Sequence, residues 1–116
     1  MTRVLVDTDV LVDHLRGHRR FQAGKDVVHV SSVTRAELFA GRATDEPNVR
    51  RLLRPFTELP VDAAVAERAG RLRRTTGIGL GDALIAATAV THRLTLVTRN
   101  LKDFDAVPRL RTRTPD

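Results

Sequence analysis

The chain of 116 residues contains no cysteine, no tryptophan and no tyrosine. The lack of cysteine excludes disulfide bonds, thiolate metal sites and cysteine nucleophiles, and it is typical of a cytoplasmic protein. Four phenylalanines are the only aromatic residues, which argues against a platform on which single-stranded bases stack. No apolar run approaches the roughly 18 residues of a membrane-spanning helix, and the first predicted strand leaves no room for a signal peptide. We therefore expect one soluble, cytoplasmic domain spanning residues 1–116, with no membrane partner.

Acidic residues are outnumbered, with 14 Asp and Glu against 20 Lys and Arg, and the formal net charge is +6. All but Lys25 and Lys102 of the basic residues are arginine, whose planar guanidinium can bind a phosphate at two points. This excess favours an anionic partner, nucleic acid first, although codon bias and solubility offer a simpler explanation. Four arginines share one face of a predicted helix and either follow phosphates or form an ordinary solvated surface: Arg68, Arg71, Arg73 and Arg74.

Short apolar runs alternate with helical patterns along the chain. The first run stops at Asp7 and is followed by apolar residues at helical spacing, which predicts a buried strand, an acid and a helix. Strands are predicted at residues 4–6, 27–30 and 94–98, with a short strand or extended link at 59–61 and an edge strand at 109–113. Helices are predicted at residues 8–16, 33–40, 45–56, 63–76 and 83–92, with a turn or short helix at 100–104. This order indicates a three-layer α/β/α fold with a mostly parallel central sheet of four to five strands and helices on both faces.

The helix predicted at residues 83–92 is apolar nearly all round. A helix without a polar face is buried, so we expect it to lie against the centre of the sheet. The residues before it, Gly79 to Asp82, are predicted to form a tight turn into the helix.

Four acids lie at the ends of predicted strands or at the starts of predicted helices. Asp7 and Asp103 follow the first and last of the predicted inner strands, Glu37 lies early in the helix after the second strand, and Asp82 precedes the buried helix. Because the carboxyl ends of parallel strands share one edge, the four carboxylates are expected to converge there. Each also has a local explanation. Asp7 and Asp82 could cap helices, Glu37 could form a capping box with Thr34, and Asp103 could be an exposed turn residue.

Crowded carboxylates repel one another unless a cation neutralises them. Ligands that are all oxygen select Mg²⁺ or Mn²⁺ over zinc, and the four scattered histidines offer no competing ligand pattern. A cation held in this way can activate water and bind phosphate oxygens while arginines hold the phosphate backbone. The residues therefore indicate metal-assisted hydrolysis of a phosphodiester.

Four segments, in this order, resemble the PIN domain, and within it the VapC-type toxin ribonucleases of bacterial toxin–antitoxin pairs. They are VLVDTDVL at residues 4–11, SSVTRAELFAG at 31–41, GDALIAATA at 81–89 and LVTRNLKDF at 96–104. Together they extend over nearly the whole chain. The resemblance implies an acidic tetrad that binds Mg²⁺ or Mn²⁺, namely Asp7, Glu37, Asp82 and Asp103, with Thr8, Thr98 and Asn100 as supporting polar groups.

The resemblance also implies an RNA substrate, a homodimer and a cognate VapB-like antitoxin that blocks the site. The chain is shorter than the family's usual length, mostly between residues 41 and 59. This region usually shapes the dimer and the antitoxin groove, so the shortening bears on partner geometry more than on catalysis.

Two other functions fit parts of the sequence. A haloacid-dehalogenase-type phosphatase would use Asp7 and Asp9 as its Asp-x-Asp pair and the segment around Asp82 as its metal motif. Against it, Leu11 replaces an expected Thr or Val, Lys25 is poorly placed, and a further acid beyond Asp82 is absent. The other alternative is a non-enzymatic, basic RNA-binding module with degenerate acids.

Overall fold

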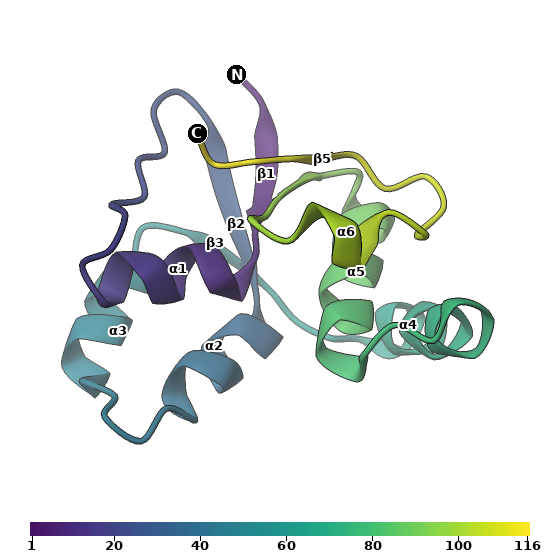
Figure 1. The fold of residues 1–116 in the computed structure, drawn as a ribbon, viewed down its shortest axis with the longest axis horizontal. Helices are drawn as coiled ribbons and strands as arrows, with labels where there is room; N and C mark the ends of the chain where they lie inside the picture. Colours follow the sequence, from purple (N-terminus) through teal and green to yellow (C-terminus); the bar gives the residue numbers. More distant parts are fainter.

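A five-stranded, all-parallel sheet forms the middle of the computed structural model, which describes residues 1–116 (Figure 1). The strand order is β3-β2-β1-β4-β5. The strands are β1 (Arg3–Val6), β2 (Val27–Ser31), β3 (Thr57–Leu59), β4 (Thr95–Val97) and β5 (Thr112–Arg113). The parallel sheet predicted from the sequence is therefore confirmed, and β1, the strand that leads to Asp7, is its central strand.

Helices cover both faces of the sheet, as predicted (Figure 1). They are α1 (Thr8–Leu15), α2 (Ser32–Phe39), α3 (Glu46–Leu53), α4 (Ala63–Thr76), α5 (Leu80–His92) and α6 (Leu101–Phe104). Alternate side chains of β1 enter two different cores. Leu5 packs with α4, α5 and Phe104, whereas Val4 and Val6 pack with α1, α2 and α3. No helix is both long and apolar enough to span a bilayer.

The apolar helix α5 is buried in the first of these cores, as its composition predicts. It follows α4 after a three-residue turn in which Gly77 adopts the left-handed conformation (φ 75°), and the two helices pack against each other in this core. The helix begins at Leu80 rather than at residue 83. Asp82 therefore lies in the first helical turn and not in the turn that precedes it.

Three further predicted boundaries are wrong by two or three residues. Strand β3 is Thr57–Leu59 rather than 59–61, because Pro60 has no N–H to donate to a sheet ladder. Helix α3 ends at Leu53 rather than at residue 56, because Pro55, two residues later, has no N–H with which to continue the helical hydrogen bonds. Strand β5 is limited to two residues and does not reach back to Arg109, which has a positive φ of 65°.

Candidate active site

Asp7 lies at the carboxyl end of the central strand, where its side chain is almost fully buried (4% exposed). Its Oδ1 accepts a hydrogen bond from the backbone N–H of Thr8 (2.8 Å) and thereby caps α1. Its Oδ2 accepts a hydrogen bond from the hydroxyl of Thr98 (2.8 Å), which follows β4. The Asp7 carboxylate caps α1 and also lies at the sheet edge where the acidic site is expected. The two explanations of Asp7 therefore do not exclude each other.

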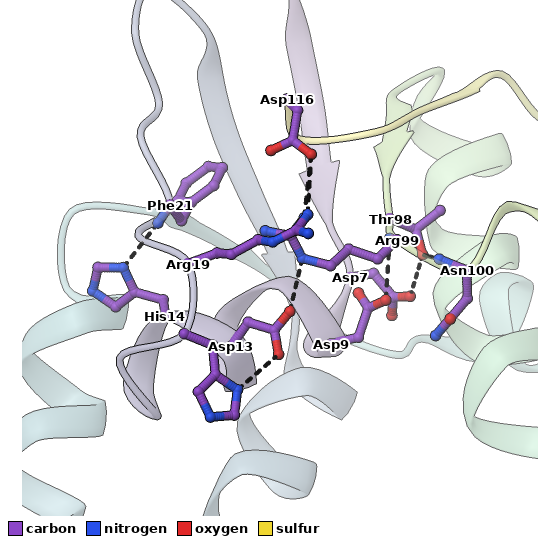
Figure 2. Close-up of polar contacts among 11 residues, drawn as sticks. Asp7, Asp9, Asp13, His14, Arg19, Phe21, Thr98, Arg99, Asn100 and Asp116 are labelled. Atoms are coloured by element: carbon purple, nitrogen blue, oxygen red, sulfur yellow. Dashed lines mark hydrogen bonds and ion pairs between the residues drawn. The ribbon is translucent and has the colours of Figure 1, made fainter.

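Thr98 links the ends of two neighbouring strands. Its hydroxyl is fully buried, donates to Asp7 and accepts a hydrogen bond from the backbone N–H of Asn100 (3.0 Å). Figure 2 shows these contacts from β1 to the segment after β4. Asn100 takes part through its main chain, and its exposed side chain makes no hydrogen bond.

Glu37 is joined to the end of β1 through Thr8. The Thr8 hydroxyl donates to Glu37 Oε1 (2.6 Å) and lies 3.0 Å from the hydroxyl of Thr34. The capping-box alternative for Glu37 is wrong, because the N-cap of α2 is Ser31, whose hydroxyl accepts from the N–H of Val33. Glu37 therefore lies one turn too far into the helix to reach the cap.

The other oxygen of Glu37 faces the start of α5. A Cβ atom on Gly81 would lie only 3.1 Å from Glu37 Oε2, so glycine at this position leaves room for the carboxylate. The next residue, Asp82, is half-buried and makes no capping bond, because the N-cap position is Gly79. Asp103 lies on α6 and is exposed. The four predicted acids thus range from a buried member, Asp7, to exposed ones at the rim.

The same acids also influence one another's pKa values through their negative charges. The pKa of Asp7 is raised to about 7, mainly by burial and then by the negative charge of Asp9, with a smaller contribution from Asp82. The hydrogen bonds from Thr98 and Thr8 act in the opposite direction. The pKa of Asp82 is raised by burial and then by the charges of Asp103, Glu37 and Asp9. Asp82 therefore lies within electrostatic reach of each of the other three predicted acids.

Asp9 is a fifth acid in this region that the sequence analysis did not assign to the tetrad. Its Oδ2 accepts a hydrogen bond from the N–H of Arg99 (3.1 Å), while its Oδ1 is buried without a hydrogen-bond partner. Burial is also the largest cause of its raised pKa. The sequence signal for it is the second acid of Asp7-Thr8-Asp9, a pair that supported only the phosphatase alternative.

Arg99 fastens the segment after β4 to α1 and to the end of the chain (Figure 2). Its Nε lies 2.8 Å from Asp13 Oδ2, and its terminal nitrogen lies 3.5 Å from Asp116 Oδ2. Arg99 Nε and Asp13 Oδ2 form a close ion pair, but the Nε–H group is not directed at an acceptor well enough to form a hydrogen bond. Arg99 therefore supplies positive charge behind the acids and holds Thr98 and Asn100 in place.

Replacing Arg99 with Met should lower the free energy of unfolding by about 1–3 kcal/mol, because Asp13 loses a mostly buried cation. Urea unfolding measures this change. Arg50→Met is the control, because its ion pair with Glu46 is exposed, and it should cost no more than about 1 kcal/mol. Equal losses in the two variants would contradict a special role for Arg99.

The donor set suits a hard divalent cation. All the acids offer oxygen, and Asp9 Oδ1 is a buried carboxylate oxygen with free lone pairs. In their present rotamers, however, no three acidic or histidine side chains are close enough to hold one ion. Carboxylates interact electrostatically over longer distances than a metal–ligand bond spans. The raised pKa values and the lack of a preformed metal-binding group are therefore consistent with each other. Asp82 lies within electrostatic reach of the other three carboxylates, and these side chains would have to rotate to share an ion.

Comparison with known proteins gives a consistent result. The sequence profile of the PIN domain matches residues 4–110. Ribonuclease VapC10 from Mycobacterium tuberculosis (strain ATCC 25618 / H37Rv) is 42% identical over 120 residues, which cover 93% of this chain and 90% of that protein. The tRNA(fMet)-specific endonuclease VapC from Shigella flexneri is 28% identical over 128 residues, which cover 97% of both chains.

Solved structures are similar over nearly the whole chain. A chain in a toxin–antitoxin complex from Klebsiella pneumoniae has a TM-score of 0.82 and 35% identity, and the match covers 97% of this chain and 98% of that one. A chain of VapBC2 from Rickettsia felis, bound to a DNA fragment from their promoter, has a TM-score of 0.81 at 22% identity and the same coverage. The second likeness supports the fold alone.

Proposed function

This chain belongs to the PIN domain family and, within it, to the VapC proteins, and on that premise we propose that it is a metal-dependent endoribonuclease toxin. The observation that carries the proposal is the set of acids at the carboxyl edge of the sheet. Asp7 is fixed by two hydrogen bonds, and Asp82 interacts electrostatically with Glu37 and Asp103. Family membership alone would also fit a degenerate member, but here every acid of the predicted tetrad is present, and the interactions of Asp82 with the other three support a shared site.

The residues have distinct roles in this proposal. Asp7 and Asp82 would be the principal ligands of Mg²⁺ or Mn²⁺, with Glu37 and Asp103 completing the site at the rim. The bound cation would supply Lewis acidity to a phosphate oxygen and a more acidic water. Thr98 and Thr8 orient Asp7 and Glu37 through their hydroxyl groups, and such supporting bonds fix where ligand oxygens point.

The phosphatase alternative requires Asp7 to attack phosphorus. Both oxygens of Asp7 already accept hydrogen bonds, and the side chain is only 4% exposed. Each oxygen keeps a second lone pair that can bind a cation, but attack on phosphorus would also require the phosphate group itself to reach this nearly buried side chain. The surroundings of Asp7 therefore suit an anchored ligand better than a nucleophile.

The similar proteins of known structure indicate which partners this protein binds. Solved relatives are described as toxin–antitoxin complexes, and one of them is 35% identical to this chain. We propose that a VapB-like antitoxin binds this protein and blocks its site, that RNA is the substrate, and that the active form is a homodimer. The cytoplasm, where RNA and such an antitoxin meet, is the compartment this function requires.

The test of the function is RNA cleavage by the purified protein with and without a divalent cation. Cleavage should require Mg²⁺ or Mn²⁺ and fall at least about a hundredfold in excess EDTA, because the cation contributes several kcal/mol to transition-state stabilisation. An excess of Mg²⁺ should restore it. Expression in bacteria should arrest growth, and Asp82→Ala should relieve the arrest. Cleavage that persists in EDTA and in purified Asp82→Ala protein would reject the metal-dependent mechanism.

A further inference from the structure

A positively charged site lies near the C-terminal end of α5, at the opposite end of this helix from Asp82. Two adjoining cavities, of about 300 Å³ and 430 Å³, share Arg68, Val90 and Arg109 in their walls. The cavities lie between α4, the last turns of α5 and the segment that leads into β5. Five arginines line them, and no acidic residue does. The arginines are Arg68, Arg71, Arg93, Arg109 and Arg111.

None of these five arginines is neutralised within the chain. The arginine ion pairs of the structure involve other residues, namely Arg19, Arg35, Arg50, Arg99 and Arg113. Within the cluster, the only side-chain hydrogen bond is a long one (3.5 Å) from Arg111 to the carbonyl of Arg93. Like charges held together without a counter-charge repel, and an anion of matching size would relieve that repulsion.

The backbone gives an independent sign that arginine is required here. Arg93 (φ 56°) and Arg109 (φ 65°) are the only non-glycine residues of the chain in the left-handed region. Glycine or asparagine would adopt this conformation at less cost. The negative end of α5 favours a cation at Arg93, but Arg109 does not follow a long helix and has no such reason. Two departures from local preference in one cluster indicate a role for the side chains.

The cluster is within reach of a polymer that also occupies the acidic site. Helix α5 has Asp82 in its first turn and Val90, which lines both cavities, eight residues later. At 1.5 Å per residue, the two ends lie about 12 Å apart along the helix axis. A few nucleotides of RNA span such a distance, whereas a single phosphate does not.

We propose that these five arginines form a binding site for the phosphate backbone of the RNA substrate, separate from the acidic site. This inference rests on the proposed function. Guanidinium groups bind phosphate oxygens at two points, which favours phosphate over single carboxylates. No aromatic side chain lines either cavity, so the contacts fall on the backbone and carry no sequence information. The site would add affinity and orient the RNA without selecting a base.

The test is the salt dependence of binding to a labelled, mixed-sequence RNA hairpin in EDTA, where metal-dependent cleavage is absent. The variant R68Q/R71Q/R111Q leaves both left-handed positions unchanged. It should weaken binding about tenfold or more and lower the slope of log Kd against log salt by about 2, since each lost contact contributes roughly 0.7–0.9. The control R20Q/R51Q/R54Q removes the same charge from exposed arginines without ion pairs and should change the slope much less.

Three results would overturn the inference. Equal loss in both triple variants would mean that net charge alone matters, and no loss in either would mean that the cluster does not touch RNA. If R68Q/R71Q/R111Q loses binding to polyglutamate but not to the hairpin, the partner is an acidic protein segment. A further variant, R68K/R71K/R111K, should keep the slope and lose part of the affinity, which guards against misfolding of the glutamine variant.

Failure of the proposed function would look different. If the wild-type protein binds the hairpin through the arginine cluster but never cleaves RNA with Mg²⁺ or Mn²⁺, the nuclease proposal falls. The phosphate-binding site would then remain, as part of an RNA-binding protein.

Discussion

Replacing Asp7 with Asn should lower RNA cleavage by about a thousandfold, because the principal carboxylate of the proposed metal site loses its charge. The same change should leave the metal-free protein at least as stable as the wild type. An amide has no charge to bury, and burial is the main reason why the pKa of Asp7 is raised. Asn is also as good an N-cap as Asp, so the hydrogen bond from Thr8 N–H survives. Activity and stability should thus move in opposite directions.

Single-turnover cleavage with Mg²⁺ measures the first effect, and urea unfolding in EDTA above neutral pH measures the second. The matched control is Asp62→Asn. Asp62 also caps a helix, by accepting from the N–H of Val65 (2.9 Å), but it is exposed and lies outside the site. This control should change neither measurement appreciably. If Asp7→Asn keeps full activity, the Asp7 carboxylate is not a metal ligand. If Asp7→Asn destabilises the metal-free protein by more than about 1 kcal/mol, the charge of Asp7 stabilises the fold, and the electrostatic argument for a cation site fails.

The acids could be located from the sequence because their positions depend on local patterns. An apolar strand that stops at Asp7, and a second one that stops at Thr98, place both residues at one edge once the sheet is parallel. The parallel sheet itself follows from the alternation of strands and helices. Local patterns could not decide which helix residue makes a cap, and so Glu37 had a capping explanation that the position of Ser31 rules out.

The remaining features depend on tertiary contacts that no local pattern encodes. Asp9 became part of the site only through its hydrogen bond with the N–H of Arg99, ninety residues away in the chain. The arginine cluster joins α4 to Arg93, Arg109 and Arg111, whereas the sequence grouped Arg68 and Arg71 with Arg73 and Arg74 on one helix face. The structure separates those pairs, because Arg73 donates to the carbonyl of Ile78 and does not line the cavities.

The metal-free protein should lose stability as pH rises from about 4 to about 7, at up to about 1.4 kcal/mol per pH unit. The pKa of Asp7 is about 7 in the folded protein, against an ordinary value of 3.8. Between these values the folded state holds a proton that the unfolded state has released. Unfolding therefore becomes easier as the proton concentration falls. The raised pKa values of Asp9 and Asp82 act in the same direction.

Urea unfolding in EDTA across this pH range measures the slope, and Asp7→Asn isolates the contribution of Asp7 from that of the other titratable groups. The slope should be shallower in Asp7→Asn and unchanged in Asp62→Asn. Mg²⁺ or Mn²⁺ binds the ionised carboxylates, so it should stabilise the wild-type protein most at and above neutral pH, by an amount that grows with its concentration. It should stabilise Asp7→Asn far less. If Asp7→Asn does not change the slope of the wild-type protein, the pKa of Asp7 is not raised in the folded state. The electrostatic argument for a metal site would then fail.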